Sequence, residues 1–270
     1  MSRAHPPEPA GSARVLAIAN QKGGVGKTTT AINLGTALGV AGRRVLVIDF
    51  DAQGNASTGF GIDRADRQTT VYDILLRGIA FDDAVRGTEV PNVDIVPATV
   101  DLSAAEIELA TDHRRAFRLR DSFAGLTRRY DHVLIDCPPS LGVLTVNALT
   151  AAHAVMVPLQ CEFFALEGLS QLLRTVERVR RSFNPMLQMH GIVLTMFDRR
   201  NNLSEQVATD VRSFMGDRVY QTIIPRNVRI SEAPSHGKPV LLYDVRSPGA
   251  QAYAHLAGEM LRRERLLAAA

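Results

Sequence analysis

The chain has 270 residues, of which 46% are hydrophobic, and this is enough for one sizeable α/β core. Its 31 lysines and arginines against 28 acidic residues make it mildly basic, which permits an anionic partner without requiring one. Two cysteines, Cys137 and Cys161, are too few for a disulfide framework and lack the spacing of a metal site. No apolar run reaches the roughly 18 residues of a membrane span. We therefore expect a cytoplasmic protein.

The N-terminal segment MSRAHPPEPAGSA, residues 1–13, is rich in proline, alanine and serine. It lacks the apolar stretch of a signal peptide, and its composition is typical of a disordered tail. No later segment has the length and composition of an interdomain linker. The sequence therefore predicts a tail over residues 1–13 and one domain over residues 14–270.

Short β-branched runs alternate with longer helical patterns from residue 14 onward. Such near-continuous apolar runs are typical of a parallel sheet that is covered on both faces, and right-handed crossovers make it doubly wound. The predicted fold class is therefore α/β, a doubly wound and mostly parallel sheet. Ligands of such sheets bind beyond the carboxyl ends of the strands. The predicted strands are 14–19, 44–49, 93–98, 132–137, 154–159, 191–197 and 219–224.

Three long helical patterns lie between and after these runs, over residues 27–42, 165–183 and 249–267. The first would end near Gly42, a common helix-stop residue. The second is strongly amphipathic, so it should cover one face of the sheet. Its predicted buried stripe consists of Leu166, Leu169, Leu173, Val176 and Val179.

The segment NQKGGVGKTTT, residues 20–30, joins the first strand to the first helix. It ends like a phosphate-binding loop, G-x-x-x-x-G-K-[ST], but Gln21 stands where the first glycine belongs. It also holds Lys22 and Lys27, two of only three lysines in the chain. A compact ammonium group suits phosphate oxygens as a point charge. The segment therefore predicts a nucleotide phosphate site with two lysines.

Each residue type in this loop has a chemical reason to be there. The glycines let successive backbone N–H groups face the phosphates at a helix N-terminus. Lys27 would neutralise the β- and γ-phosphates of ATP, and the Thr28 hydroxyl would bind Mg²⁺. The predicted ATP-contacting residues here are Lys22, Gly23, Gly24, Val25, Gly26, Lys27, Thr28 and Thr29.

Carboxylates follow two of the predicted strands. Asp136 ends the strand in VLIDCPPS and would hold a magnesium-bound water. Asp49 and Asp51 follow VLVI, where Asp49 would support the magnesium site from behind and Asp51 would orient the attacking water. Acidic residues after a strand are also common as turn formers and helix caps. The neighbouring phosphate loop favours the catalytic interpretation.

Several motifs in order resemble the ParA/Soj family of chromosome- and plasmid-partitioning ATPases, which carry a deviant Walker A motif. The resemblance extends from about Val15 to about His255. The segments that carry it are KGGVGKTT, DFDAQGN, DCPPSLG, CEFFALEGLSQLL and IIPRNVRISEAPSHGKP.

The resemblance implies a role for the second lysine. In this family it reaches across an ATP-dependent sandwich homodimer to the triphosphate of the partner subunit, so here it would be Lys22. Gly23 would lie where the two backbones approach most closely. Pro225 would pack on the adenine, and Asn227 would hydrogen-bond to it. From the sequence alone, the Pro-x-Asn segment indicates only a turn after a strand.

The resemblance also implies non-specific binding of double-stranded DNA by the ATP-bound dimer. A ParB-type partner would stimulate hydrolysis through Asp51 and release the DNA, which places the protein at the nucleoid. Taken alone, the arginines concerned would more commonly form a solvated face. They follow two neighbouring strands and are Arg199, Arg200, Arg226 and Arg229.

Three alternatives share much of this pattern. A MinD-like membrane ATPase would use a C-terminal amphipathic helix, for which Tyr253, Leu256, Met260 and Leu267 have helical spacing. A metabolic ligase such as a cobyrinate amidase-like enzyme would often need an added amidotransferase domain, for which this length leaves no room. A positioning ATPase with a protein cargo shares nearly every motif.

Overall fold

The computed structural model describes residues 13–123, 126 and 129–269. Most of the predicted tail lies outside these residues, but Ala13 is described and buried. Within the described chain, one sheet of eight strands has the order β3-β4-β2-β5-β1-β6-β7-β8. The strands are β1 (Arg14–Ile18), β2 (Val45–Asp49), β3 (Arg86–Gly87), β4 (Val93–Val96), β5 (His132–Asp136), β6 (Ala154–Gln160), β7 (Gln188–Phe197) and β8 (Val219–Pro225).

The predicted fold class is confirmed, because all neighbouring strands pair in parallel except β3 and β4. All seven predicted strands are present, with ends shifted by a few residues. Strand β3 was not predicted. It consists of only two residues, Arg86 and Gly87, at the sheet edge, and so short an antiparallel strand has no hydrophobic alternation to detect.

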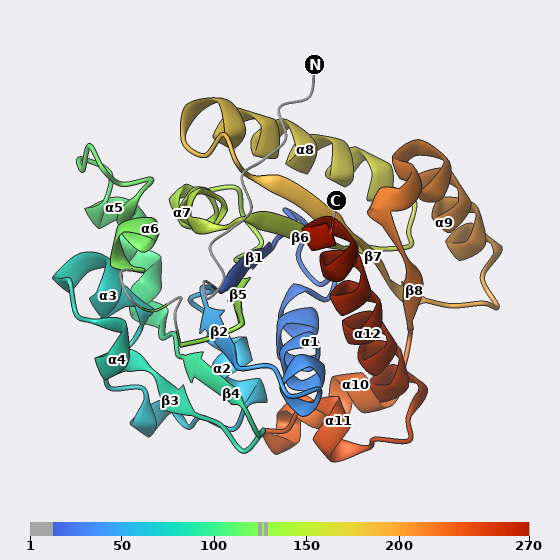
Figure 1. The fold of residues 1–270 in the computed structure, drawn as a ribbon, viewed down its shortest axis with the longest axis horizontal. Coiled ribbons are helices and arrows are strands. Elements are labelled where there is room, and N and C mark those ends of the chain that lie inside the picture. The colour runs from blue at the N-terminus through green and yellow to red at the C-terminus, as the bar shows by residue number, and fades with distance from the viewer. Residues whose placement is uncertain (1–12, 124–125, 127–128, 270) are drawn as a thin grey trace.

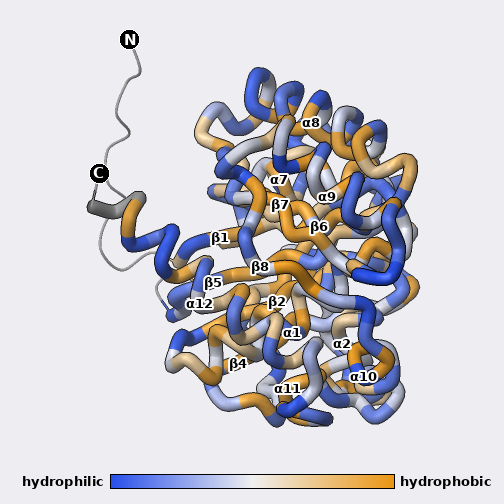
Figure 2. The backbone as a smooth tube through the Cα atoms, turned by 90° about the vertical axis from the view of Figure 1, so that its right-hand side faces the viewer, coloured by the Kyte–Doolittle hydropathy of each residue, from blue (hydrophilic) through white to orange (hydrophobic). Residues whose placement is uncertain are grey.

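Helices cover both faces of the sheet (Figure 1). One core cluster joins the sheet to α1, α2 and α12, and the other joins it to α3, α6, α7, α8 and α9. Figure 2 shows the hydrophobic strands running through the middle of the molecule. The helices are α1 (Lys27–Val40), α2 (Asn55–Gly59), α3 (Val71–Arg77), α4 (Phe81–Ala84), α5 (Ala105–Glu108), α6 (Arg118–Ser122), α7 (Val143–Ala151), α8 (Ala165–Ser182), α9 (Asn202–Met215), α10 (Val228–Glu232), α11 (Val240–Tyr243) and α12 (Pro248–Ala269).

Helix α8 buries nearly the predicted stripe. Leu169, Val176 and Val179 are buried, whereas Leu166 and Leu173 are only partly buried. The centre of the buried face is Leu172, which is 0% exposed and was not in the predicted stripe. The stripe is therefore rotated slightly from its predicted position, towards the line through Leu169, Leu172 and Val176.

Helix α12 packs its apolar side against the sheet and α1. Tyr253, Leu256 and Met260 are at most 1% exposed, and the Tyr253 hydroxyl lies 3.2 Å from Thr30 Oγ1 of α1. These three side chains are therefore covered by protein and are not a lipid-facing stripe; the side chain of Leu267 lies outside the described residues. No helix in the described part of the chain is long and apolar enough to cross a membrane.

Two helical glycines test how tightly the layers pack. A Cβ at Gly39 of α1 would lie 2.5 Å from Val93 Cγ2 and 2.7 Å from the Pro91 carbonyl oxygen. A Cβ at Gly258 of α12 would meet only the flexible Arg262 side chain, 3.4 Å away. The Gly39 contact involves backbone, so the turn before β4 would have to move.

We expect Gly39→Ala to destabilise the fold by about 1–3 kcal/mol, because overpacking outweighs the better helix propensity of alanine. Gly258→Ala is the matched control and should be neutral or stabilising by up to about 1 kcal/mol. Urea unfolding of both variants measures this difference. Equal stability of the two variants would show that the α1–β4 contact is not tight.

Candidate nucleotide-binding site

The phosphate-loop segment turns sharply between β1 and α1. Gly24 and Gly26 have φ angles of 74° and 92°, a left-handed conformation that glycine adopts without strain. Gly26 is the N-cap of α1, so Lys27 begins the helix. Lys27 is 6% exposed, and its Nζ donates a 2.9 Å hydrogen bond to the Lys22 carbonyl oxygen. The lysine thus folds back over the loop that it follows.

Neighbouring elements hold the loop at three points. Asn20 Nδ2 donates to the Pro158 carbonyl of β6 at 2.8 Å, and Thr195 Oγ1 of β7 donates to the Val25 carbonyl at 2.8 Å. Gln21, which replaces the usual glycine, donates from Nε2 to Gln171 Oε1 of α8 at 2.6 Å. The loop is therefore preorganised by side chains as well as by its glycines.

The parallel register brings the predicted carboxylates together. Asp49, the last residue of β2, is the pairing partner of Asp136, the last residue of β5, and both are 0% exposed. Asp49 Oδ2 accepts hydrogen bonds from the Ser57 N–H at 2.8 Å and the Ser57 hydroxyl at 2.6 Å. Both oxygens of Asp136 are buried without a hydrogen-bond partner in the described chain.

Burial raises the pKa of both carboxyls of this pair, and the Asp49 charge adds to the effect at Asp136. Burial, opposed by the Ser57 hydrogen bonds, raises the pKa of Asp49 to about 6. Burial and then the Asp49 charge raise the pKa of Asp136 well above its usual value. The nearby Thr28 hydroxyl and the Lys27 charge act to lower it, but in the described chain Thr28 is not within hydrogen-bonding geometry of either Asp136 oxygen. Burial lowers the pKa of Lys27, and Asp136 partly offsets this. A cation bound at this site would therefore favour the ionised form of both carboxyls.

Asp51 lies at the start of a segment that one buried arginine holds in place. Its Oδ1 accepts a 3.0 Å hydrogen bond from the Gln53 N–H, and the side chain is half-buried. Arg67, which is 7% exposed, donates to the carbonyls of Gly54, Ala98 and Ile62 at 2.8 to 3.2 Å. This guanidinium joins the segment after Asp51 to the end of β4.

Lys22 does not point at its own loop. Its side chain is 43% exposed, and its Nζ forms an ion pair with Glu162, which follows β6. The Lys22 backbone N–H is occupied as well, because it donates to Asn20 Oδ1 at 3.1 Å. The two loop lysines therefore have different surroundings: Lys27 is buried over the loop, and Lys22 is held at its outer rim.

The other predicted residues follow β7 and β8. Pro225 ends β8 and pairs with Phe197, and Asn227 is the N-cap of α10, with its Oδ1 buried and without a hydrogen-bond partner in the described chain. Arg199, Arg200 and Arg226 line one groove. Arg200 is paired with Asp198, and Arg229 lies on α10 and is paired with Glu232 and Asp244.

Some residues of the site were not predicted from the sequence. Glu162 lies inside the quoted segment CEFFALEGLSQLL, but only the fold brings it to Lys22. Ser57, Arg67 and Thr195 act through backbone and carboxylate contacts that join distant segments. No local motif marks such residues. The cysteines have no site role in this geometry: both are free and buried, and burial raises the pKa of Cys161 to about 11.

Comparison with known proteins gives the family of the chain. A family model described as an AAA domain matches residues 13–189. The chromosome partitioning protein ParA of Caulobacter vibrioides is 65% identical over 254 residues, which cover 93% of this chain and 95% of that protein. The chain belongs to the ParA/Soj family of chromosome-partitioning ATPases. The Soj protein of Bacillus subtilis, named a sporulation initiation inhibitor, is 53% identical over 92% of this chain and 98% of its own.

Solved structures with the ParA/Soj-like fold agree. A cobyrinic acid a,c-diamide synthase from Mycobacterium smegmatis, with bound ADP and magnesium, superposes with a TM-score of 0.82 at 40% identity, covering 94% of this chain and 96% of that one. MinD of Pyrococcus furiosus has a TM-score of 0.78 at 28% identity, covering 93% and 99%. Chain length by itself therefore does not separate this protein from one that is named a diamide synthase.

The raised pKa of Asp49 predicts a pH-dependent stability. Between about pH 4 and pH 6 the folded chain holds a proton that the unfolded chain has released, so the free energy of unfolding falls as pH rises through this window. Two pKa units correspond to about 3 kcal/mol. Asp49→Asn keeps an oxygen for Ser57 and removes this dependence, so its profile should be flatter.

Urea unfolding without nucleotide at pH 4 to 7 measures this effect. The exposed Asp63→Asn is the control and should follow the parent protein. Parallel profiles for Asp49→Asn and the parent would contradict the assignment.

Arg67 predicts a second difference in stability. Arg67→Ala would leave buried carbonyls without donors and should cost about 2–4 kcal/mol. Arg64→Ala, at an exposed position three residues earlier, should change stability by no more than about 0.5 kcal/mol. The urea midpoints of the two variants measure this difference in stability, and equal midpoints would contradict the anchoring role of Arg67.

Proposed function

We propose that the protein is an ATP-driven DNA-partitioning switch, in which ATP binding favours a homodimer that binds DNA and hydrolysis releases it. The observation that carries this proposal is that Lys27 lies near Asp51 and near Asp136, whose buried oxygens have no hydrogen-bond partner in the described chain, while Lys22 lies at the outer rim of the loop.

The residues at this edge fit a magnesium nucleotide. The described residues contain no group of three or more side chains that would hold a metal ion alone, which agrees with Mg²⁺ that takes phosphate oxygens and water as ligands. Thr28 and Asp136 would hold it, Asp136 through water, with Asp49 behind them. The ion would neutralise charge on the phosphates. Asn227 Oδ1, buried and without a partner in the described chain, would accept from the adenine amino group, with Pro225 against the ring.

Asp51 is the carboxylate best placed to orient the attacking water. It lies two residues beyond Asp49 and is half-buried, so water can reach it. Asp49 is unsuitable because Ser57 occupies one of its oxygens and the side chain is fully buried. The anchored segment after Asp51 would keep this side chain in position.

A homodimer that forms through the face at the carboxyl ends of the strands explains the position of Lys22. Lys22 would leave Glu162 to reach the triphosphate of the partner subunit. A Cβ at Gly23 would be 3.9 Å from its nearest neighbour, Pro139, so the single chain has room for a side chain there and only a close partner would not. Large apolar side chains are also exposed on the segments that follow β4, β6 and β8, and a dimer would cover them: Val100, Phe163, Phe164 and Val228 are 60–75% exposed.

DNA binding would use the arginines beyond β7 and β8, which a dimer doubles. Arg199 and Arg226 have no ion-pair partner in the described chain, so both are available to phosphates. Arg200 and Arg229 would exchange their carboxylate partners for DNA. Phosphate contacts carry no sequence information, so binding would be non-specific and salt-dependent. A ParB-type partner would stimulate hydrolysis and release the protein from the nucleoid.

The decisive experiment measures DNA binding by Asp51→Ala with ATP, with ADP and without nucleotide, at two salt concentrations. This variant should hold ATP in the dimer, so it should bind a duplex of arbitrary sequence tightly with ATP only, and more weakly at high salt. Lys22→Ala in the same background is the control: it should bind ATP but neither dimerise nor bind DNA.

Absence of DNA binding by Asp51→Ala in every nucleotide state would reject the switch. Wild-type turnover by Asp51→Ala would remove this residue from the mechanism.

A further inference from the structure

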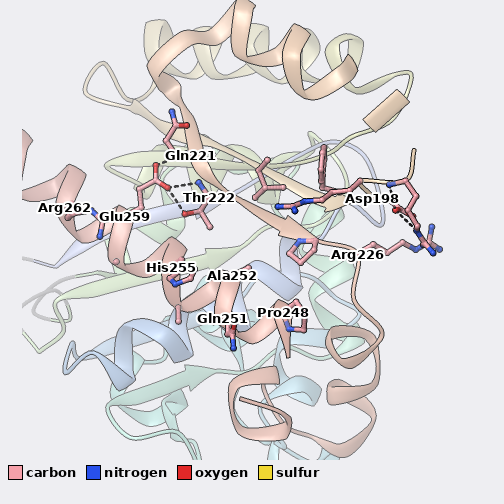
Figure 3. Close-up of a pocket in the computed structure, with 17 residues that line it drawn as sticks. Asp198, Gln221, Thr222, Arg226, Pro248, Gln251, Ala252, His255, Glu259 and Arg262 are labelled. Atoms are coloured by element: carbon pink, nitrogen blue, oxygen red, sulfur yellow. Dashed lines mark hydrogen bonds and ion pairs between the residues drawn. The ribbon is translucent and has the colours of Figure 1, made fainter. Parts of the chain in front are cut away.

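A large groove lies between the edge strand β8 and helix α12, with a volume of about 1240 Å³ (Figure 3). Strand β8 is the last strand on this side of the sheet in the described chain. The face of α12 towards the groove carries Gln251, Ala254, His255, Gly258 and Arg262, at helical spacing. The small alanine and glycine leave the groove open. Figure 3 places Arg262 and Asp198 at opposite ends of it.

Hydrogen-bond donors within the protein compensate the negative charge of the acidic residue in the middle of the groove. Glu259 accepts hydrogen bonds from the N–H groups of Gln221 and Thr222, both at 2.9 Å, and from Arg263 at 2.8 Å. Although burial acts to raise the pKa of Glu259, these donors hold it below its usual value. Glu259 therefore adds little negative charge to the groove surface.

Three arginines along the groove form no ion pair in the described chain, although Arg226 is close enough to Asp198 to help lower its pKa: Arg199, Arg226 and Arg262. Arg262 is 14 residues beyond Pro248 on α12, a rise of about 21 Å. Positive charge thus lies at both ends of the groove, with Arg262 well beyond the arginines after β7 and β8 (Figure 3). A surface of this kind attracts an extended polyanion.

We propose that the α12 side of this groove, with Arg262 as its cation and Gln251 as its hydrogen-bond donor, binds the phosphate backbone of duplex DNA and extends the DNA site along the edge of the sheet. The proposal rests on the proposed function. One DNA strand carries a phosphate about every 3.4 Å of helix axis, so the groove spans about six phosphates.

An acidic peptide is less well matched to this groove. A peptide that extends a sheet edge needs free backbone donors on the edge strand. In β8 the N–H groups of Gln221 and Thr222 are occupied by Glu259. Recognition must therefore come from side chains, and arginine with glutamine suits phosphate oxygens.

The test measures duplex binding by fluorescence anisotropy with Mg-ATP over a range of salt, in the Asp51→Ala background. Arg262→Gln should weaken binding about eightfold at about 100 mM salt, and the plot of log affinity against log salt should become shallower by about one unit for each phosphate that is no longer bound. Arg265→Gln is the matched control, because Arg265 is exposed on the same helix, bonded to the Leu261 carbonyl, and outside the groove. It should leave both quantities unchanged.

Gln251→Glu adds a carboxylate of nearly the same shape, so it should weaken binding by a similar factor; its cost to α12 is one exposed 3.3 Å hydrogen bond, from Gln251 Nε2 to the Arg246 carbonyl. Arg200→Glu in the same series tests the DNA site of the proposed function, which does not include α12, so it separates the two proposals. If DNA binds with ATP but Arg262→Gln and Gln251→Glu match Arg265→Gln, the groove proposal is overturned and the switch stands. If the background protein binds no DNA, the proposed function fails.

Discussion

Two buried carboxylates on neighbouring strands are the constraint around which this protein is built. The parallel pairing of β2 with β5 places Asp49 beside Asp136, and full burial raises the pKa of both carboxyls, with the Asp49 charge adding to the effect at Asp136. Burying like charges is unfavourable unless a cation or donors compensate. Ser57 compensates Asp49, but Asp136 keeps two oxygens without a donor in the described chain. The Asp136 carboxylate therefore needs a cation or a hydrogen-bond donor at the place where a magnesium nucleotide would bind.

The loop beside these carboxylates is rigid for reasons that its glycines alone do not supply. Contacts from β6, β7 and α8 hold its backbone, and Gln21 takes part through α8. Replacement of the usual glycine by glutamine is thereby linked to a tertiary contact. The same loop leaves Lys22 at the rim beside Glu162, where a solvent-exposed pair is weak and can exchange partners.

Helix α12 has two different sides. Its apolar side packs against α1 and the sheet, with Tyr253 bonded to Thr30 of the helix that begins at the phosphate loop. Its polar side forms one wall of the groove beside β8, where Glu259 occupies edge-strand donors. The helix thus closes the core and shapes a charged surface, and its apolar stripe is not free to enter a lipid surface.

The sequence by itself determined the fold class and most of the nucleotide loop, because strands, loop glycines and helix starts are local signals with fixed periods and spacings. It also marked Asp49 and Asp136 as strand-end residues, and the family motifs identified the partitioning class. Only the tertiary structure decided which groups meet: Glu162 with Lys22, Ser57 with Asp49, Arg67 with three carbonyls, and Leu172 at the centre of α8. These contacts join segments far apart along the chain or depend on the rotation of a helix about its axis, and no local pattern records either.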